Sequence, residues 1–413
     1  MIKNSIYLDY AATTPCDKRV VDFMIPYFSE IFGNPNSLHI YGQKALESLN
    51  FAREKVSSFL NAQNDEVIFT SGSTESNNIA ICRVASRIFK KNGKNHIITL
   101  KTEHKSVLDA FERMKRDYNF DVTFLDVKSD GILDLEKLRE SINEKTSLVS
   151  ICFLNNETGV IQNVKEISRI CHEKDVLLHI DATQAFGKIE VDVKDLDIDF
   201  MSASGHKIYG PKGVGILYFK RKHLALLKNP GANNDVEFGI RAGTIPVSLV
   251  MGFYKAAEIC MSEMKQTYER ISRLRDKLIK GLFDNLDELY INGSQESFYP
   301  GIIDISFRGV EGEALMMEAH RICVSSGSAC TSNKLSISHV LDAMNIPSDI
   351  AQSSLRISIG RFTTEEDIDI AIEDLINATK KLREMSPVWE MIQNGLDLDL
   401  IFKDRRSHHE HEI

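Results

Sequence analysis

The sequence predicts an α/β protein with a large domain built on a largely parallel sheet, followed by a smaller α+β domain. Short apolar runs alternate with helical patterns over the first 220 residues, as in chains whose parallel strands are joined by helices. Several runs are apolar at every position, which is typical of strands buried on both faces. A long helical pattern then runs from Val247 to Leu282 and leads into a second unit with its own strands and helices.

The first unit contains seven apolar runs that we predict to be strands. They are Glu66–Thr70, His96–Leu100, Val122–Asp126, Leu148–Leu154, Val176–Asp181, Phe200–Ser204 and Gly213–Phe219. Helical patterns lie between these runs and are expected to cover the sheet. The predicted helices are Thr74–Lys90, Lys105–Arg116, Leu135–Glu140 and Val164–His172.

The second unit mixes strand and helix patterns. Its predicted strands are Ile302–Phe307 and Leu355–Ile359, and its predicted helices are Glu311–Arg321, Ser336–Met344 and Thr364–Leu382. Such a mixture without strict alternation favours a small α+β domain.

The composition of the chain excludes some classes of partner. The 413 residues include 43% hydrophobic and 26% charged residues, an ordinary balance for a globular protein with a large core. Lys and Arg number 50 and Asp and Glu number 59, which gives a net charge of −9. An acidic balance argues against nucleic acid or an anionic membrane as the main partner.

The cysteines and the N-terminal segment indicate in which cellular compartment the protein is expected. Seven cysteines stand at positions 16, 82, 152, 171, 260, 323 and 330, and no two form a Cys-x-x-Cys pair. An odd count without framework spacing fits a reducing compartment. Asp9 lies where a signal peptide needs apolar residues, and no run approaches the roughly 18 apolar residues of a membrane span. We therefore expect a cytoplasmic protein.

The segment Ser71-Gly72-Ser73-Thr74 follows a predicted strand and opens a predicted helix. Free backbone N–H groups at a helix N-terminus, together with small hydroxyl groups, form a site for an anion such as phosphate. The same residues also suit an ordinary helix N-cap, with Glu75 beside the positive end of the helix. The segment is not a Walker A loop, because no Gly-Lys-Ser/Thr follows it.

Two more polar groups come at the ends of predicted strands. Asp181 ends an apolar strand, where a buried carboxylate needs a partner such as a protonated pyridine nitrogen, although a helix cap explains it equally well. Lys207 follows the next strand, and a lysine among polar groups can form an imine with an aldehyde, although a lone lysine is more often a surface residue. Together, an anion loop, an acidic strand end and a lysine loop describe pyridoxal phosphate held at one edge of the sheet.

Longer motifs are spread over almost the whole chain. They are Tyr7-Leu-Asp-Tyr-Ala-Ala-Thr-Thr-Pro15, Gly33-Asn-Pro-Asn-Ser37, Thr102-Glu-His104-Lys, Asn155-Asn156-Glu-Thr-Gly159, Ser204-Gly-His-Lys207, Ser325-Ser-Gly-Ser-Ala-Cys330-Thr-Ser332 and Ser386-Pro-Val-Trp389-Glu-Met. On these motifs the sequence resembles the cysteine desulfurases of the IscS and NifS type, in the class V aminotransferase group of fold type I pyridoxal-phosphate enzymes.

The resemblance implies a domain organisation. A large pyridoxal-phosphate-binding domain with a mainly parallel seven-stranded sheet is expected over residues 16–262. A small α+β domain is expected from residues 1–15 and 263–413, and it would carry the persulfide loop and a partner-binding C-terminal tail.

The resemblance also implies roles for residues around the cofactor, pyridoxal 5′-phosphate. Lys207 is expected to form the imine with its aldehyde, Asp181 to pair with its ring nitrogen and Gln184 to contact its ring hydroxyl. His104 is expected to stack on the ring and to move protons. The residues expected to bind its phosphate are Ser73, Thr74, Ser204, His206 and, from the other protomer, Thr244.

Substrate binding and sulfur transfer involve three further residues in the resemblance. Asn156, which would also contact the cofactor, and Arg356 are expected to bind the substrate carboxylate, for which the planar guanidinium fork is suited. Cys330 matches the family nucleophile, whose thiolate attacks the substrate sulfur and becomes a persulfide. The same thiolate is expected to be a transient ligand of a nascent [2Fe–2S] cluster shared with a scaffold protein.

One loop departs from the family pattern. The family usually has Gly-Gly-Gly-x-Glu-Arg-Gly before Arg-x-Gly-Thr, whereas this chain lacks the three glycines at 233–235 and has Phe238 in place of the arginine. Loss of glycine restricts backbone conformations with positive φ, although Asn and Asp tolerate them best. Phe238 removes a positive charge near the expected phosphate, so we expect a weaker contact through Thr244 and a lower cofactor affinity.

The sequence therefore predicts a homodimeric cysteine desulfurase that converts L-cysteine into L-alanine and an enzyme persulfide. The sulfur is expected to pass to an iron–sulfur scaffold protein and to sulfur-relay proteins for tRNA thiolation, with no direct nucleic acid or membrane partner. Two alternatives stay open. One is a selenocysteine lyase, which the cysteine loop disfavours. The other is a non-catalytic platform of the same fold for sulfur-transfer partners, supported only by the altered loop at 233–238.

Overall fold

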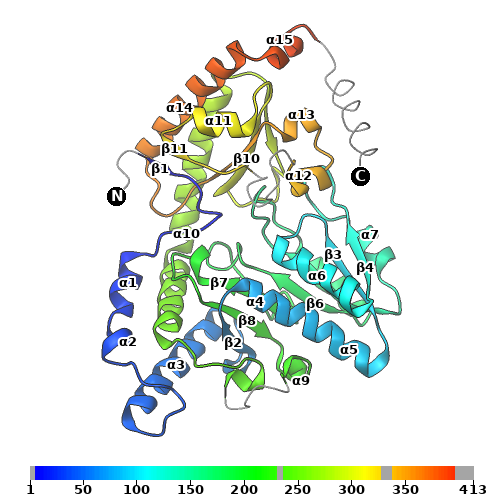
Figure 1. Ribbon diagram of the computed structural model, residues 1–413, viewed down its shortest axis with the longest axis vertical. Helices are drawn as coiled ribbons and strands as arrows, with labels where there is room; N and C mark the ends of the chain where they lie inside the picture. Colours follow the sequence, from blue (N-terminus) through cyan, green and yellow to red (C-terminus); the bar gives the residue numbers. More distant parts are fainter. Residues whose placement is uncertain (1–4, 230–235, 327–336, 396–413) are drawn as a thin grey trace.

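The computed structural model describes residues 5–229, 236–326 and 337–395 (Figure 1). Its strands are β1 Ile6–Tyr7, β2 Val67–Thr70, β3 His96–Leu100, β4 Asp121–Leu125, β5 Thr146–Cys152, β6 Leu177–Asp181, β7 Phe200–Ser204, β8 Gly215–Phe219, β9 Leu289–Asn292, β10 Ile302–Phe307, β11 Ile322–Cys323 and β12 Ser354–Ser358. Its α-helices are α1 Lys18–Met24, α2 Pro26–Ser29, α3 Ile40–Phe59, α4 Ser73–Asn78, α5 Val84–Asn92, α6 Lys105–Tyr118, α7 Leu135–Ser141, α8 Val164–Glu173, α9 Leu224–Leu227, α10 Val247–Phe283, α11 Gly312–Glu318, α12 His339–Ala343, α13 Ser348–Ala351, α14 Glu365–Glu384 and α15 Pro387–Gln393.

The largest sheet has seven strands in the order β2-β8-β7-β6-β5-β3-β4. Neighbouring strands pair in parallel except at β8, which runs antiparallel to both β2 and β7. The prediction of an α/β fold with a mainly parallel seven-stranded sheet is confirmed. Because β2, β6 and β7 run in the same direction, their carboxyl ends meet at one edge of the sheet, where α/β proteins bind ligands.

The sheet separates two apolar layers, because successive side chains of a strand point to opposite faces. Along β2, Val67 and Phe69 belong to one layer and Ile68 belongs to the other. Along β7, Met201 and Phe200 divide in the same way. Helices α4, α5 and α6 cover one face, and α3 and the first half of α10 cover the other (Figure 1). The buried side chains of α8 belong to the same layer as those of α3 and α10. This is why the strands read as continuous apolar runs.

Helix α10 is 37 residues long and joins two parts of the molecule. Near its start Gly252 packs against Met24 of α1, and near its end Gly281 packs against Ile372 of α14. Beyond α10, β9, β10 and β12 form an antiparallel sheet, and β1 pairs in parallel with β11. We propose that the domain boundary falls at residue 262 within α10. In the part of the chain that the structure describes, no helix is long and apolar enough to cross a membrane.

Some predicted helix limits are wrong, and other contacts explain them. The helix predicted over Glu311–Arg321 ends at Glu318, because Ile322 and Cys323 pair with β1 instead. The helix predicted from Ser336 begins at His339 in the described residues, because the Ser338 hydroxyl accepts the N–H groups of the first turn.

A network of charged groups ties α8 to β7 on the large sheet. Both ring nitrogens of His172 lie 2.8 Å from carboxylate oxygens, one of Asp197 and one of the fully buried Asp199. Asp199 also accepts from His223 at 3.0 Å and lies 3.1 Å from the Lys220 ammonium. Hydrogen bonding to Asp199 raises the pKa of His172, and these donors hold the pKa of the Asp199 carboxyl far below its usual range despite its burial.

We expect Asp199→Ala to lower the free energy of unfolding by about 3–5 kcal/mol, because it leaves buried charged donors without their shared partner. The raised pKa of His172 stabilises the fold below about pH 6.5, and this contribution is lost as the pH rises through its folded value. The lowered pKa of Asp199 stabilises the fold above about pH 4 and is lost as the pH falls.

Urea unfolding from pH 4 to 9 checks this prediction, with the largest difference expected between about pH 4 and 6.5. The matched control is Asp195→Ala, which breaks only the exposed pair with Lys165 and should cost less than about 1 kcal/mol. Equal losses in the two variants would contradict the prediction.

Candidate active site

The carboxyl ends of three parallel strands bring the predicted site residues together. Asp181 is the last residue of β6, and Ser204 is the last residue of β7. The loop after β2 leads through Gly72 into α4, whose first residue is Ser73. A methyl group added to Gly72 would lie 3.7 Å from the Ser204 hydroxyl, so the start of α4 and the end of β7 face each other.

The start of α4 has free backbone donors. Gly72 has a φ of 153°, a conformation that favours glycine, and no side chain of the described residues caps this helix end. The Glu75 carboxylate accepts from the Ser71 N–H at 2.6 Å and pairs with Arg241 at 2.9 Å, so it does not cap the N–H groups of the first turn. The helix therefore presents uncapped N–H groups next to the hydroxyl groups of Ser73 and Thr74, which is an arrangement that suits phosphate.

Asp181 is buried, and only part of the hydrogen-bond acceptor capacity of its carboxylate is used. Its Oδ2 accepts from the Asn77 side-chain amide at 2.8 Å, and its Oδ1 accepts from the Thr183 N–H at 2.9 Å. A carboxylate offers about four acceptor positions, so capacity for a further donor remains. The Thr183 hydroxyl is also buried without a hydrogen-bond partner among the described residues.

Lys207 lies just after β7, at the end of a short 3-10 turn that begins at Gly205. Its Nζ donates to the carbonyl oxygens of Ala11 at 2.8 Å and Ala12 at 2.6 Å. The Gln184 amide donates to the same Ala11 oxygen at 2.8 Å. The N-terminal segment therefore crosses the site and joins the two side chains.

His206 neighbours Lys207 and faces the same N-terminal segment. Its Nδ1 lies 3.2 Å from the Thr13 hydroxyl. Burial, and then the positive charges of Lys207 and Lys212, lower the pKa of His206 to about 4. The imidazole is therefore neutral at neutral pH and can donate one hydrogen bond and accept another.

His104 is the N-cap residue of α6, and a chain of hydrogen bonds connects it to Asp181. Its Nδ1 accepts from the Ser106 N–H at 3.1 Å and lies 2.8 Å from the Ser106 hydroxyl. That hydroxyl accepts from the Asn77 amide at 3.0 Å, and the same amide donates to Asp181. Desolvation by the surrounding protein lowers the pKa of His104, although the residue keeps an exposed surface.

Arg356 on β12 is buried, yet its guanidinium keeps donors free. It donates to Asp9 Oδ1 at 2.8 Å and to the Asn156 carbonyl oxygen at 3.2 Å. Its Nε is buried without a hydrogen-bond partner among the described residues. Opposite it in the sheet, burial raises the pKa of Asp304 to about 8, so that this carboxyl stays neutral at neutral pH. A carboxylate ligand fits these free donors.

Two predicted site residues stand apart from this group. Thr244 is exposed in the segment before α10, and no contact within the described residues joins it to the helix start or to Lys207. Cys330 lies outside the described residues, as do positions 233–235 of the altered loop.

Phe238 packs beside Arg53. Its backbone is left-handed, with φ of 56°, and its ring lies 5.2 Å from the Arg53 guanidinium. The neighbouring Glu237 is buried, pairs with Arg53 at 2.8 Å and accepts from the Phe69 N–H at 3.0 Å. The described part of the loop is therefore anchored by this ion pair instead of by glycines.

The prediction from sequence missed three residues that hold the site together. Asn77 lies four positions after Ser73, which places both on one face of a helix. Lys188 follows Gln184 by four positions, and its ammonium donates to the Gln184 side-chain oxygen. Asp9 belongs to a motif noted in the sequence, but nothing in that motif indicates its pairing with Arg356.

The residues present fit pyridoxal phosphate. The uncapped start of α4 suits the phosphate, the unused acceptor capacity of Asp181 suits a protonated ring nitrogen, and the amine of Lys207 suits the aldehyde. All three groups lie at or just after the carboxyl ends of strands, at one edge of the sheet.

Comparisons with known proteins agree with this geometry. The family model described as Aminotransferase class-V matches residues 6–370. The chain therefore belongs to the class-V aminotransferase family, and its cofactor is pyridoxal 5′-phosphate. Within that family it groups with the cysteine desulfurases of the IscS and NifS type.

Two similar proteins illustrate the grouping. "Cysteine desulfurase" of Homo sapiens is 47% identical over 397 residues, which cover 96% of this chain and 86% of the human protein. "Cysteine desulfurase IscS" of Ehrlichia chaffeensis is 49% identical over 398 residues, which cover 96% of each chain.

Two solved structures share the fold. A chain titled "NIFS-LIKE PROTEIN" aligns with a TM-score of 0.84 and 35% identity over 91% of this chain and 100% of its own length. One titled "SspA in complex with cysteine" aligns with a TM-score of 0.77 and 32% identity, over 87% of this chain and 100% of its own.

Proposed function

We propose that this chain removes the sulfur of L-cysteine, releasing L-alanine and leaving the sulfur as a persulfide on Cys330. The observation that carries the proposal is the group at the sheet edge: Lys207, Asp181 and the open start of α4 lie together, and Arg356 adds free buried donors. The relatives named cysteine desulfurase support the choice of substrate.

The cofactor is held at four places in this proposal. Lys207 binds its aldehyde, Asp181 its ring nitrogen and Gln184 its ring oxygen. The phosphate is bound by Ser73, Thr74, Ser204 and the neutral His206. When bound, pyridoxal phosphate supplies a ring that stabilises negative charge at the α-carbon of the substrate.

The remaining residues handle the substrate. Arg356 binds its carboxylate through the guanidinium donors left free, and Asn156 lies beside it through the contact of its carbonyl oxygen with Arg356. His104 moves a proton at its Nε2, because Nδ1 is occupied by Ser106. Its lowered pKa keeps it neutral, and therefore able to accept a proton.

The sulfur transfer needs one nucleophile. The Cys330 thiolate attacks the sulfur of bound L-cysteine and forms a new S–S bond. The C–S bond of the substrate breaks, its electron pair stays with the carbon, and protonation of that carbon gives alanine. A thiolate is needed because it is a far stronger nucleophile toward sulfur than a neutral thiol.

The test is a product assay on the cofactor-loaded protein with L-cysteine and a reducing thiol. We expect alanine and sulfide in equal amounts, because each turnover releases one alanine and the thiol reduces one persulfide. Pyruvate and ammonia in place of alanine would contradict the proposal. Activity with selenocysteine alone would favour the selenocysteine lyase, and no product from either substrate would favour the non-catalytic platform.

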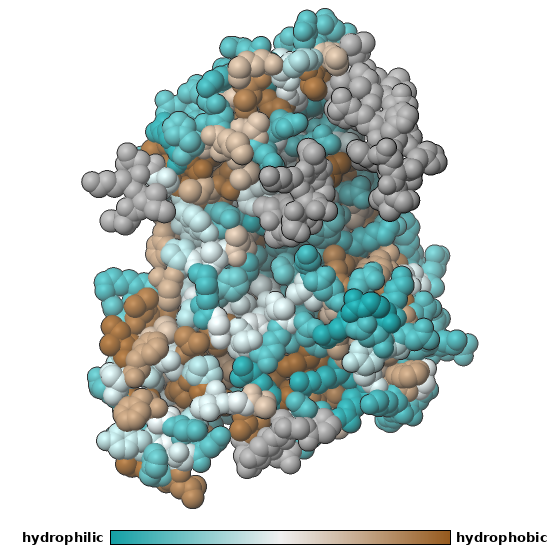
Figure 2. Space-filling view, in the orientation of Figure 1, coloured by the Kyte–Doolittle hydropathy of each residue, from teal (hydrophilic) through white to brown (hydrophobic). Residues whose placement is uncertain are grey.

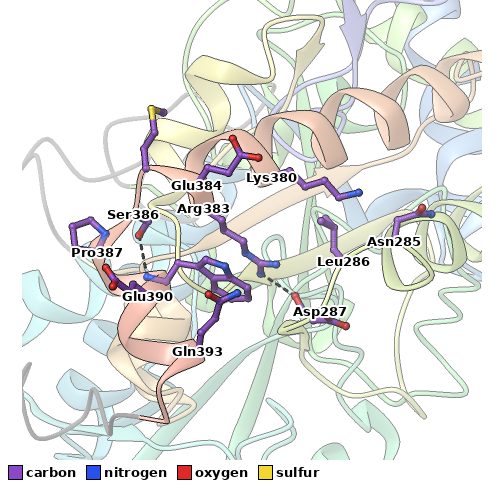
Figure 3. Close-up of a pocket in the computed structure, with 12 residues that line it drawn as sticks. Asn285, Leu286, Asp287, Lys380, Arg383, Glu384, Ser386, Pro387, Glu390 and Gln393 are labelled. Atoms are coloured by element: carbon purple, nitrogen blue, oxygen red, sulfur yellow. Dashed lines mark hydrogen bonds between the residues drawn. The ribbon is translucent and has the colours of Figure 1, made fainter.

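We propose further that the sulfur passes to an iron–sulfur scaffold protein and to sulfur-relay proteins for tRNA thiolation. Support comes from the IscS name of close relatives and from a cavity of about 630 Å³ between α14, α15 and the segment Asn285–Asp287 that follows α10 (Figure 3). In it the Arg383 guanidinium lies 3.9 Å from the Trp389 ring centroid and donates to the Asp287 carbonyl oxygen at 2.9 Å. Arg383 is buried beneath the half-buried Trp389 ring, which lines the cavity, and aromatic residues are enriched at protein interfaces.

A scaffold bound there would contact α15, which ends at Gln393. We also propose a cytoplasmic location, because the odd number of cysteines without disulfide-framework spacing fits a reducing compartment. One relative is named "Probable cysteine desulfurase, mitochondrial".

We also propose a homodimer. Apolar side chains gather on the surface of α1, α2, α3 and the segment between α2 and α3, which forms part of the brown area at the lower left of Figure 2. The exposed fractions are 62% for Phe28, 60% for Phe32 and 92% for Leu38. Such a contiguous exposed patch on a globular chain marks an interface. In a dimer, Thr244 would reach the phosphate of the partner's site.

Sedimentation velocity checks the dimer. We expect Phe28→Glu combined with Phe32→Glu to shift the protein from dimer to monomer, because two charges would be buried without partners in the interface. Met317→Glu is the matched control, since Met317 is 79% exposed on α11, away from the patch. A parent protein that sediments as a monomer, or a double variant that remains dimeric, would contradict the proposal.

A further inference from the structure

A continuous chain of hydrogen bonds links Lys188 to Lys207. The Lys188 ammonium donates to Gln184 Oε1, and Gln184 Nε2 donates to the Ala11 carbonyl oxygen at 2.8 Å. That oxygen also accepts from Lys207 Nζ at 2.8 Å. The chain thus runs from Lys188 through the Gln184 amide to the backbone that Lys207 contacts.

This chain fixes the orientation of an amide that is otherwise ambiguous. The oxygen and nitrogen of a glutamine amide are nearly identical in shape, so their hydrogen-bond partners decide which way the group points. An ammonium has only donors and therefore requires Oε1, whereas the Ala11 carbonyl has only acceptors and requires Nε2. The two requirements agree, and among the described residues only the Ala11 carbonyl accepts from Gln184 Nε2, which leaves its second N–H for another acceptor.

The surroundings of Lys188 strengthen the effect of its positive charge on neighbouring groups. Its ammonium is 5.9 Å from the Tyr299 ring centroid, and the other charged or titratable groups around it are Lys207, Cys260 and Arg356. Burial, followed by the positive charge of Lys207, lowers the pKa of Lys188 to about 7. Lys188 is half-buried, and the charged form of a half-buried lysine acts on nearby groups more strongly than that of a fully exposed one.

We propose that Lys188 is a positioning residue, which holds the Gln184 amide with Nε2 toward the ring oxygen of the cofactor and places a positive charge behind it. The inference rests on the proposed binding of the cofactor at Lys207. A donor and a positive charge both stabilise the negatively charged ring oxygen. They therefore lower the proton affinity of the bound cofactor.

The experiment is a pH titration of the absorbance of the cofactor-loaded protein. We expect the midpoint to rise by about one pH unit in Lys188→Met, because one charge and the fixed amide are both lost. Lys188→Arg keeps a charged donor and should stay near the parent value. Lys194→Met, which removes an exposed lysine elsewhere, is the control and should not move the midpoint.

A double-mutant cycle separates positioning from a general structural effect. Gln184→Ala should also raise the midpoint. The double variant with Lys188→Met should shift the midpoint by less than the sum of the two single shifts, because Lys188 acts through Gln184. Gln184→Ala also keeps the inference testable if Lys188→Met does not fold, since an unchanged midpoint in Gln184→Ala overturns it.

The outcomes for the inference and for the proposed function can be told apart. An unchanged midpoint in Lys188→Met, or fully additive shifts, overturns the role of Lys188 and leaves that of Lys207 standing. A parent protein with no lysine-bound cofactor absorbance overturns both.

Discussion

Lys207→Ala should abolish the absorbance of the lysine-bound cofactor and reduce turnover of L-cysteine at least about a thousandfold, because the amine that binds the aldehyde is gone. The fold should survive. Ala11 O keeps its hydrogen bond from Gln184, and Ala12 is exposed, so water can replace the lysine there. We expect a loss of no more than about 1 kcal/mol in the free energy of unfolding.

Absorbance spectra after dialysis, thermal unfolding and the product assay measure the three parts of this prediction. Reduction of the parent protein with borohydride, followed by peptide mass spectrometry, should place the cofactor on Lys207. The control is Lys212→Ala, an exposed lysine of the same loop, which should keep both absorbance and activity. Absorbance retained in Lys207→Ala would place the covalent attachment on another residue.

The sheet could be predicted from the sequence because its strands are buried on both faces. The predicted limits of β3, β7 and β10 match the structure at both ends. Other strands are displaced by one or two residues, as for β5, which begins at Thr146 instead of Leu148. Apolar runs show that a strand exists, but pairing with neighbours sets where it ends.

Helix α3 was not predicted, and its composition explains why. The face that it buries consists largely of small residues such as Gly42, Ala45 and Ala52, together with the charged Arg53. Its outer face carries Leu46 and Phe51, which belong to the exposed apolar patch. The contrast between an apolar inner face and a polar outer face is therefore weak, and the usual periodicity is hidden.

The helix predicted over Thr74–Lys90 contains a feature that no sequence pattern shows. A π-helical segment at Ile79–Arg83 joins α4 to α5. It changes which residues of α5 face the sheet, since each wide turn holds an extra residue. Only packing against α6 and β7 determines that choice.

The site could be predicted where chemistry is concentrated in short motifs, and not where it depends on tertiary contacts. Asp181, Ser204 and Lys207 come at strand ends, so topology alone brings them together. Arg356 and Asp9 are separated by 347 positions, and only the pairing of the N-terminal segment with β11 and β12 places them 2.8 Å apart. The spacing of residues along the chain cannot predict such a pair.

Cys330→Ser should leave cofactor binding unchanged and stop the release of sulfide from L-cysteine. Binding is unaffected because the phosphate, ring and aldehyde contacts proposed above do not involve the thiol. Sulfur removal stops because a serine hydroxyl at neutral pH is a far poorer nucleophile toward sulfur than a thiolate. With selenocysteine some activity should persist, since a selenium leaving group depends less on thiolate attack.

The described residues on both sides of Cys330 support its role as the acceptor. Ser325 exchanges backbone hydrogen bonds with Arg356, at 3.2 and 2.7 Å, and Ser338 donates to Glu157, the residue after Asn156. The described residues before and after position 330 therefore lie beside the two proposed substrate-binding residues. Sulfide and alanine measurements, with the exposed Cys323→Ser as control, test the prediction. If Cys330→Ser released both products at the parent rate, the thiol would not be the acceptor, and the enzyme would act as a lyase.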